Sequence, residues 1–117
     1  MTLTITSLHP DFAISAQISP NDLSVIAQQG FKTVFNHRPD GEGGETQPLS
    51  AELARAAQAV GLSYQYLPVL PGQYSQADVA QMRALLAQSE RPILAFCRTG
   101  TRARQLYDLA LALPNGH

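Results

Sequence analysis

The sequence predicts an α/β fold with a mostly parallel sheet, and three observations support this prediction. Short β-branched or aromatic segments alternate with longer segments whose apolar residues have helical spacing. Glycine or proline separates most of these segments, as expected at the ends of helices and strands. Ile93–Phe96 is the most apolar of the short segments, which is typical of a central strand buried on both faces. In such a fold, ligands bind beyond the carboxyl ends of the strands.

The first thirty residues predict a hairpin and a helix. Alternating apolar residues near the start and the segment Asp11–Ser15 predict two short strands, parted by His9-Pro10, at an edge of the sheet. Ser19-Pro20-Asn21-Asp22 combines a capping residue with a proline suited to the first helical turn. A helix is therefore expected from this point to Gly30.

The middle of the chain predicts a strand, a polar loop, a second helix and a second strand. Phe31–Phe35 is β-branched and aromatic, and it leads into Asn36–Glu45, whose proline and glycine content argues against regular structure. Pro48-Leu49-Ser50 is expected to cap a helix that ends at Gly61, and Leu62–Leu67 is expected to form a strand.

The last third predicts a third helix, the central strand and a last helix. Pro68–Tyr74 forms a loop, after which Ser75 and Asp78 have the spacing of a capping box. Arg91-Pro92 introduces the apolar strand, and the last helix begins at Thr101 and is broken by Pro114. The loops after three strands are therefore expected to meet at one edge of the sheet.

Composition and charge exclude several classes of protein. The 117 residues suit one domain, residues 1–117, with a single core. The formal net charge of -1 provides no global attraction to nucleic acid or to an anionic membrane. The single cysteine forms no internal disulfide, and with no recognisable secretory signal a cytoplasmic location is expected. No apolar stretch approaches the roughly 20 residues that span a bilayer.

The segment after the central strand carries the most informative chemistry. It reads Cys97-Arg98-Thr99-Gly100-Thr101-Arg102-Ala103-Arg104 and lies between a buried strand and a helix start. A helix N-terminus presents unpaired N–H groups and partial positive charge, which favour a thiolate and a bound anion. Gly100 permits a turn that points N–H groups inward, and a guanidinium grips two oxygens at once. The sequence predicts Cys97 as a nucleophile, an anion-binding loop of Arg98, Thr99, Gly100 and Thr101, and Arg102 as the clamp.

Two plainer interpretations compete with this hypothesis. A lone cysteine at the end of a strand is most often a small buried hydrophobic residue. That interpretation gives no reason for three arginines so close together in a chain with only 8 basic side chains. The arginines could instead form a solvated face, which is the interpretation favoured for Arg104. Thr101 is expected to cap the last helix.

Several motifs, in order along the chain, resemble those of a known family. They are Ala16–Pro20, Gly30–Val34, Asn36–Glu42, Tyr66–Val69 and the cysteine loop. The loop is similar to the active-site loops of rhodaneses and of the tyrosine phosphatase superfamily. The whole chain resembles a bacterial family of small phosphatase or sulfurtransferase domains, called β-lactamase-hydrolase-like, which also occur fused to metallo-β-lactamase-like sulfur dioxygenases. The resemblance implies a dual-specificity-phosphatase-like fold, with a four- or five-stranded sheet flanked by helices, and Cys97 and Arg102 as catalytic residues.

The spacing within the loop favours sulfur chemistry over phosphate chemistry. Tyrosine phosphatases place a histidine before the cysteine and one residue more between cysteine and arginine, whereas here Phe96 precedes Cys97 and four residues separate it from Arg102. The shorter spacing is similar to that of rhodaneses, whose loop holds a persulfide. The loop Pro68–Tyr74, where a phosphatase would hold its general acid, contains no carboxylate. The leading hypothesis is a sulfurtransferase that carries sulfane sulfur as a Cys97 persulfide.

Two alternatives remain open. A phosphomonoester hydrolase would act through a cysteinyl-phosphate, with Asp40 or Glu42 as the acid. The plainer interpretation makes these carboxylates part of a solvated turn, whose geometry Asp40-Gly41 sets. His37 and Arg38 would orient an anionic substrate at the mouth of the site, although a lone histidine in a polar loop is more often exposed. In the third hypothesis the protein is a redox sensor or an anion-binding adaptor.

The partners follow from the same considerations. No cofactor is implied, and three scattered histidines without metal-ligand spacing argue against a metal site. The expected substrate is a small anion, either a sulfane-sulfur donor or a phosphomonoester. The family resemblance implies a metallo-β-lactamase-like sulfur dioxygenase as a partner.

Overall fold

A five-stranded sheet lies at the centre of the computed structural model, which describes residues 3–114. The strands are β1 (Ile5–His9), β2 (Phe12–Ser15), β3 (Thr33–Asn36), β4 (Ser63–Tyr66) and β5 (Ile93–Phe96). Their order across the sheet is β1-β2-β5-β3-β4, and only β1 runs antiparallel to its neighbour. The predicted mostly parallel sheet, its edge hairpin and its central apolar strand are confirmed.

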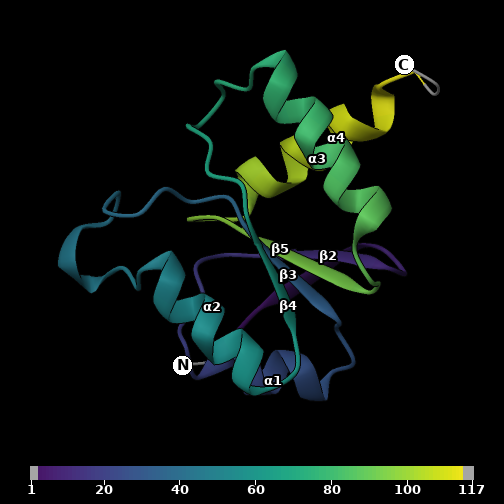
Figure 1. Cartoon of the computed structure of the whole chain (residues 1–117). Helices are drawn as coiled ribbons and strands as arrows, with labels where there is room; N and C mark the ends of the chain where they lie inside the picture. Colours follow the sequence, from purple (N-terminus) through teal and green to yellow (C-terminus); the bar gives the residue numbers. More distant parts are fainter. Residues whose placement is uncertain (1–2, 115–117) are drawn as a thin grey trace.

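Four helices cover the two faces of the sheet. They are α1 (Asp22–Gln28), α2 (Ser50–Ala59), α3 (Gln76–Gln88) and α4 (Thr101–Ala112). Helices α1 and α2 pack on one face, and α3 and α4 pack on the other (Figure 1). None of the helices in the described part of the chain is long and apolar enough to cross a membrane.

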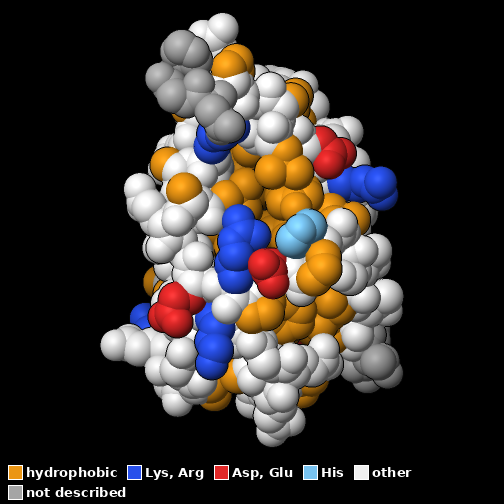
Figure 2. All heavy atoms as spheres, turned by 90° about the vertical axis from the view of Figure 1, so that its right-hand side faces the viewer, with side chains coloured by type: hydrophobic (Ala, Val, Ile, Leu, Met, Phe, Trp, Pro, Cys, Tyr) orange, Lys and Arg blue, Asp and Glu red, His pale blue; other side chains and the backbone are white. Residues whose placement is uncertain are grey.

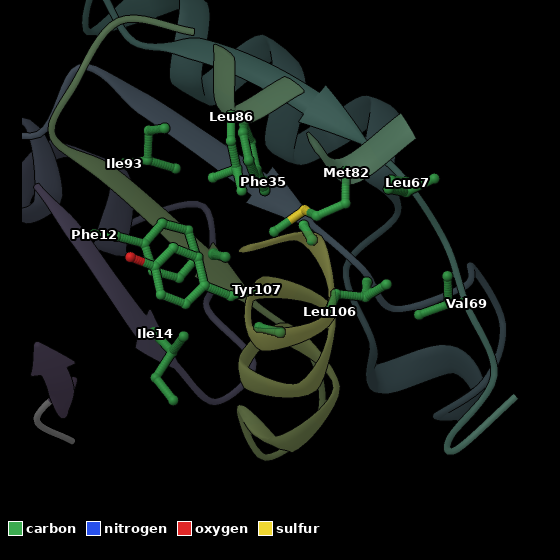
Figure 3. Close-up of a cluster of buried hydrophobic side chains, with 13 residues drawn as sticks. Phe12, Ile14, Phe35, Leu67, Val69, Met82, Leu86, Ile93, Leu106 and Tyr107 are labelled. Atoms are coloured by element: carbon green, nitrogen blue, oxygen red, sulfur yellow. The ribbon is translucent and has the colours of Figure 1, made fainter. Parts of the chain in front are cut away.

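An apolar core lies between each face of the sheet and the helices that cover it, because successive side chains of a strand point to opposite faces. On the α3 and α4 face, the rings of Phe12 and Tyr107 stack with centroids 4.0 Å apart, and Phe35 and Met82 belong to the same buried cluster (Figure 3). Fully burying one such side chain stabilises the fold by roughly 1.5–3 kcal/mol. These cores hold the strand ends, and thus the loops that follow them, at fixed positions.

The helix starts agree with the predictions in part. Ser75 and Asp78 form the predicted capping box of α3. Helix α1 begins at Asp22, later than expected, and the Asp22 carboxylate accepts hydrogen bonds from the backbone and hydroxyl of Ser19. Ser50 is the first residue of α2 rather than its cap, and its N–H donates to Asp40 Oδ1 at 2.8 Å. A side chain distant in sequence therefore caps α2.

The loops after β3, β4 and β5 meet at one edge of the sheet, as predicted. The backbone N–H of His37 donates to the carbonyl of Phe96 at 2.9 Å, and that of Val69 donates to the carbonyl of His37 at 3.1 Å. The loop after β3 contains one turn of 3-10 helix, Gly44–Thr46, so the expectation that it holds no regular structure is wrong. The hydrogen-bonded loops bring Cys97 and the segment after Asn36 into one site.

The surface carries charges of both signs. Figure 2 shows one face of the molecule, where apolar patches lie between scattered acidic and basic side chains. This mixture agrees with the formal net charge of -1, and the face shows no continuous basic area of the kind that binds nucleic acid.

Candidate active site

Cys97 follows the central strand directly and lies at the base of the predicted loop. Its side chain is fully buried, and its Sγ accepts a hydrogen bond from the backbone N–H of Gly100 at 3.1 Å. Gly100 has φ of 97°, in the left-handed region that favours glycine, and a Cβ there would lie 3.4 Å from the carbonyl oxygen of Ser15. The loop therefore turns an N–H group toward the sulfur, as an anion-binding loop requires.

Of the two threonines in the loop, Thr101 has a structural role that differs from the predicted one. Gly100 occupies the N-cap position of α4, and Thr101 is the first helical residue, so the prediction that Thr101 caps this helix is wrong. The Thr99 hydroxyl instead accepts from the Thr101 N–H at 3.4 Å and donates to the Thr101 hydroxyl at 3.1 Å. Both threonines line a hollow above the loop.

Arg102 points into the site from the first turn of α4 and is held on two sides. Its side chain is 5% exposed, and its Nη1 donates to the carbonyl of Val69 at 3.0 Å. Its two terminal nitrogens also bind the Glu42 carboxylate, at 2.8 Å to Oε2 and 2.6 Å to Oε1. Glu42 thus occupies the fork that the sequence assigns to a substrate anion. The hydrogen bonds that Arg102 donates to Glu42 raise the pKa of Arg102.

Glu42 is ionised at neutral pH. Hydrogen bonds from Arg102 and Arg38, the latter at 2.9 Å from Nε, lower the pKa of the Glu42 carboxyl to about 2, although burial opposes this shift. A carboxylate without a proton cannot donate one to a leaving group. In this arrangement Glu42 pairs with arginine rather than acting as an acid.

Asp40 is likewise engaged in structure. Its Oδ1 accepts from the N–H of Ser50 at the start of α2, and its own N–H donates to the hydroxyl of Tyr66 at 2.9 Å. An acidic side chain at a helix N-terminus satisfies a free N–H and interacts favourably with the helix dipole. Asp40 and Glu42, the two carboxylates considered as the general acid, are thus both engaged in other contacts.

His37 and Arg38 differ in how they contribute to the site. His37 is completely buried rather than exposed, and its Nδ1 lies 2.9 Å from the carbonyl oxygen of Leu67. Burial lowers the pKa of His37 to about 4, so the ring is neutral at pH 7 and Nδ1–H donates to Leu67. Arg38 binds Gln17 Oε1 at 3.1 Å as well as Glu42, and it lines the mouth of the site.

A polar network that the sequence analysis missed supports the loop after β3. The Asn36 side chain donates to the Tyr64 hydroxyl at 2.9 Å, and this hydroxyl also lies 2.9 Å from the Ser50 hydroxyl. Asn36 accepts from the N–H of Arg38 at 2.9 Å. Burial raises the pKa of Tyr64, which keeps the phenol protonated. Tyr64 and Tyr66 are two residues apart in β4 and therefore point to the same face of the sheet. This spacing was the sequence signal that could have indicated the network.

Two hollows open above the cysteine loop. One, of about 590 Å³, is lined by Arg38, Glu42, Gly43, Pro71, Arg98 and Arg102. The other, of about 310 Å³, shares Pro71, Arg98 and Arg102 and adds Gly72, Thr99, Thr101 and two residues that the sequence analysis missed, Tyr74 and Gln105. Within residues 3–114, no group of three or more His, Cys, Asp or Glu side chains could hold a metal ion. Arg98 and Arg102 thus line both hollows above the loop that contains Cys97.

Comparison with known proteins places the chain in a family. Residues 4–114 match the family of the phosphatase-like domain of beta-lactamase hydrolase-like proteins. The beta-lactamase hydrolase-like protein of Xylella fastidiosa strain Temecula1 is 33% identical over 108 residues, which are 92% of this chain and 25% of that protein. The chain thus spans about a quarter of the length of the curated relatives it matches.

Solved structures share the fold. A candidate phosphatase of Neisseria meningitidis superimposes with a TM-score of 0.83 and 36% identity, covering 94% of this chain and 80% of that one. The kinase-associated phosphatase, at 17% identity, has a TM-score of 0.62 over 88% of this chain and 68% of its own, which shows the fold alone. The dual-specificity-phosphatase-like fold is confirmed. On these grounds the chain belongs to the phosphatase-like domain family of the beta-lactamase hydrolase-like proteins.

Proposed function

We propose that the protein is a thiol-dependent sulfurtransferase that carries sulfane sulfur on Cys97. One observation carries the proposal: the site supplies a sulfur atom and groups that bind an anion, but the two carboxylates considered as the general acid, Asp40 and Glu42, are already engaged. Glu42 is paired with Arg102 and Arg38, and Asp40 caps α2. Sulfur transfer needs no strong general acid, because sulfite is a stable leaving group.

The proposed reaction has two steps. The Cys97 thiolate attacks the outer sulfur of a donor such as thiosulfate, a sulfur–sulfur bond forms, the donor's sulfur–sulfur bond breaks, and sulfite leaves with the electron pair. A thiophilic acceptor such as cyanide then attacks the outer sulfur of the persulfide and leaves as thiocyanate, which regenerates the Cys97 thiolate. Both steps balance without an external oxidant, reductant or proton.

The loop would stabilise the persulfide by its backbone and the donor by its cations. The N–H of Gly100 already points at the Cys97 sulfur, at 3.1 Å. Arg98 and Arg102 line both hollows, so an anionic donor that enters from either meets positive charge. The four-residue spacing between Cys97 and Arg102 makes a smaller loop than that of the tyrosine phosphatases.

Phosphomonoester hydrolysis is the second candidate, and the family and fold favour it. The matched family is described as phosphatase-like, and the Neisseria relative is a candidate phosphatase. Cys97 would form a cysteinyl-phosphate, and a protonated group would have to reach the leaving oxygen. Asp40 would have to leave the N-terminus of α2 for this role, and Glu42 would have to leave two arginines.

A paired assay on one preparation separates the two chemistries. Thiosulfate-to-cyanide sulfur transfer and aryl-phosphate hydrolysis are measured with the wild-type chain, Cys97→Ser and Asp40→Asn. Because Cys97 is the only cysteine, the mass of a trapped intermediate reports on it alone. Sulfur transfer with a one-sulfur mass increase, lost in Cys97→Ser and kept in Asp40→Asn, supports the proposal.

The opposite results have equally definite meanings. Aryl-phosphate turnover with a phosphorylated cysteine, lost in Asp40→Asn, would establish the phosphatase and overturn the sulfur carrier. Rapid oxidation of Cys97 by peroxide without either turnover would favour a redox sensor. If sulfur transfer is found, a metallo-β-lactamase-like sulfur dioxygenase is the partner we propose to consume the transferred sulfur.

A further inference from the structure

We infer that the active site continues into an apolar groove that binds the organic part of its substrate. The substrate would then be an anion attached to an alkyl or aryl group, rather than a free inorganic anion. In sulfur transfer this is an organic sulfane-sulfur anion such as a thiosulfonate. The inference rests on the proposed function, because it takes the cysteine loop as the site of the anionic group.

The groove lies between α3 and α4, next to one of the hollows above the cysteine loop. It has a volume of about 540 Å³, within the range of small-molecule sites, and Val79, Ala80, Leu109 and Leu113 contribute to its walls. Tyr74 lines both this groove and the hollow above Thr99, Thr101 and Arg102. The Tyr74 hydroxyl donates to Gln105 Oε1, which holds the ring between the two spaces. One side chain is thus a shared wall of the anion site and the groove.

Helix α4 connects the two ends of this path. Thr101, Gln105 and Leu109 are spaced four residues apart within the helix and therefore lie along one side of it. The rise of about 1.5 Å per residue places Leu109 roughly 12 Å along the axis from Thr101. This side changes from hydroxyl and amide groups near Cys97 to apolar groups further along. A ligand with a charged head and an apolar tail matches that order.

The surface chemistry of the groove favours an apolar tail as its occupant. Among residues 3–114, no charged side chain lines it, whereas Arg98 and Arg102 line the adjoining hollow. Leu109 is 43% exposed, so covering it with a ligand removes apolar surface from water. A free inorganic anion has no group that could fill the groove. An apolar groove next to a hollow lined by arginines therefore points to one ligand that spans both.

Two non-hydrolysable probes test the inference without relying on turnover. Methylphosphonate presents the anionic head alone, and hexylphosphonate adds an apolar tail. Isothermal titration calorimetry on the full chain measures both affinities. A buried methylene improves binding about fourfold, so the partly buried hexyl tail is expected to bind about 30-fold more tightly than the methyl group.

Two variants on the same helix locate the tail. Leu109→Gln is expected to remove most of the hexyl advantage and to leave methylphosphonate binding unchanged. Leu111→Gln is the matched control, because Leu111 is 59% exposed and lines a different hollow, beside Leu86 and Arg91. It is expected to bind both probes as the wild-type chain does.

Each other result overturns a defined part of the reasoning. Equal affinity for the two phosphonates, or a hexyl advantage that survives Leu109→Gln, would overturn the groove and leave the anion site standing. Loss of the advantage in Leu111→Gln as well would show that it does not depend on this groove. Binding of neither probe would overturn the anion site of the proposed function, and the groove's role with it.

Discussion

The ion pair between Glu42 and Arg102 makes a quantitative prediction about anion binding. The Glu42 carboxylate holds both terminal nitrogens of Arg102, at 2.6 and 2.8 Å, which are the positions a substrate anion would take. An anion must therefore displace Glu42 or bind beside its negative charge. Glu42→Gln keeps the size of the side chain and removes the charge, so we expect it to strengthen anion binding.

The structure sets the size of this effect. The lowering of the Glu42 pKa from 4.5 to about 2 corresponds to roughly 3 kcal/mol of favourable interaction in the absence of solvent screening. The side chain is 24% exposed, and water screens such pairs, so about 1 kcal/mol is a realistic net value. Removal of this competition should strengthen anion binding about fivefold.

The assay is calorimetric titration of thiosulfate into Cys97→Ser, with and without Glu42→Gln, so that no turnover interferes. Glu45→Gln is the control, because Glu45 is exposed and lies on the same loop. Weaker binding in Glu42→Gln would refute the reasoning. It would show that Glu42 positions Arg102 for the anion instead of competing with it.

The same pair should influence stability at low pH. The pKa of Glu42 is lower in the folded chain than in the unfolded one, so its stabilising contribution is present above about pH 4.5 and is lost as the pH falls toward about 2. Urea unfolding at a series of pH values measures this loss. The loss should be smaller in Glu42→Gln, and an identical pH profile would show that the pair does not stabilise the fold.

Three further predictions concern residues around the site. The pKa of His37 is about 4 in the folded chain, below its ordinary value of 6.5. Between these two pH values the unfolded chain binds more protons than the folded chain. The free energy of unfolding should therefore decrease as the pH falls from 6.5 to 4, by up to about 3 kcal/mol. Urea unfolding of His37→Gln should show a smaller decrease, and an unchanged slope would contradict this. Gly100→Ala should cost about 1–2 kcal/mol of unfolding free energy and reduce sulfur transfer, because φ there is 97°; wild-type stability and activity would contradict this. Asp40→Ala should lower stability by about 1 kcal/mol through loss of the α2 cap while sulfur transfer continues, and loss of turnover without loss of stability would contradict this.

Local patterns in the sequence were sufficient to predict the fold class and the position of the cysteine loop. The capping box of Ser75 and Asp78, the apolar strand Ile93–Phe96 and the glycine of the cysteine loop act over a few residues, so the sequence displays them directly. The placement of Cys97 between a buried strand and a helix N-terminus followed from the same signals.

The tertiary structure alone decided which groups the loop residues contact. Arg102 is 60 positions from Glu42, and Ser50 is 10 from Asp40, so nothing in their local sequence indicates these contacts. The contact between Arg102 and Glu42 arises because the crossovers of a parallel sheet bring the loops after β3 and β5 to one edge. The contact between Asp40 and Ser50 arises because the loop after β3 folds back onto the start of α2. The same packing buries His37 and places Tyr74 between the groove and the hollow above the cysteine loop. Helical and strand periods act over short distances and determine the elements, whereas strand order determines which distant charges meet.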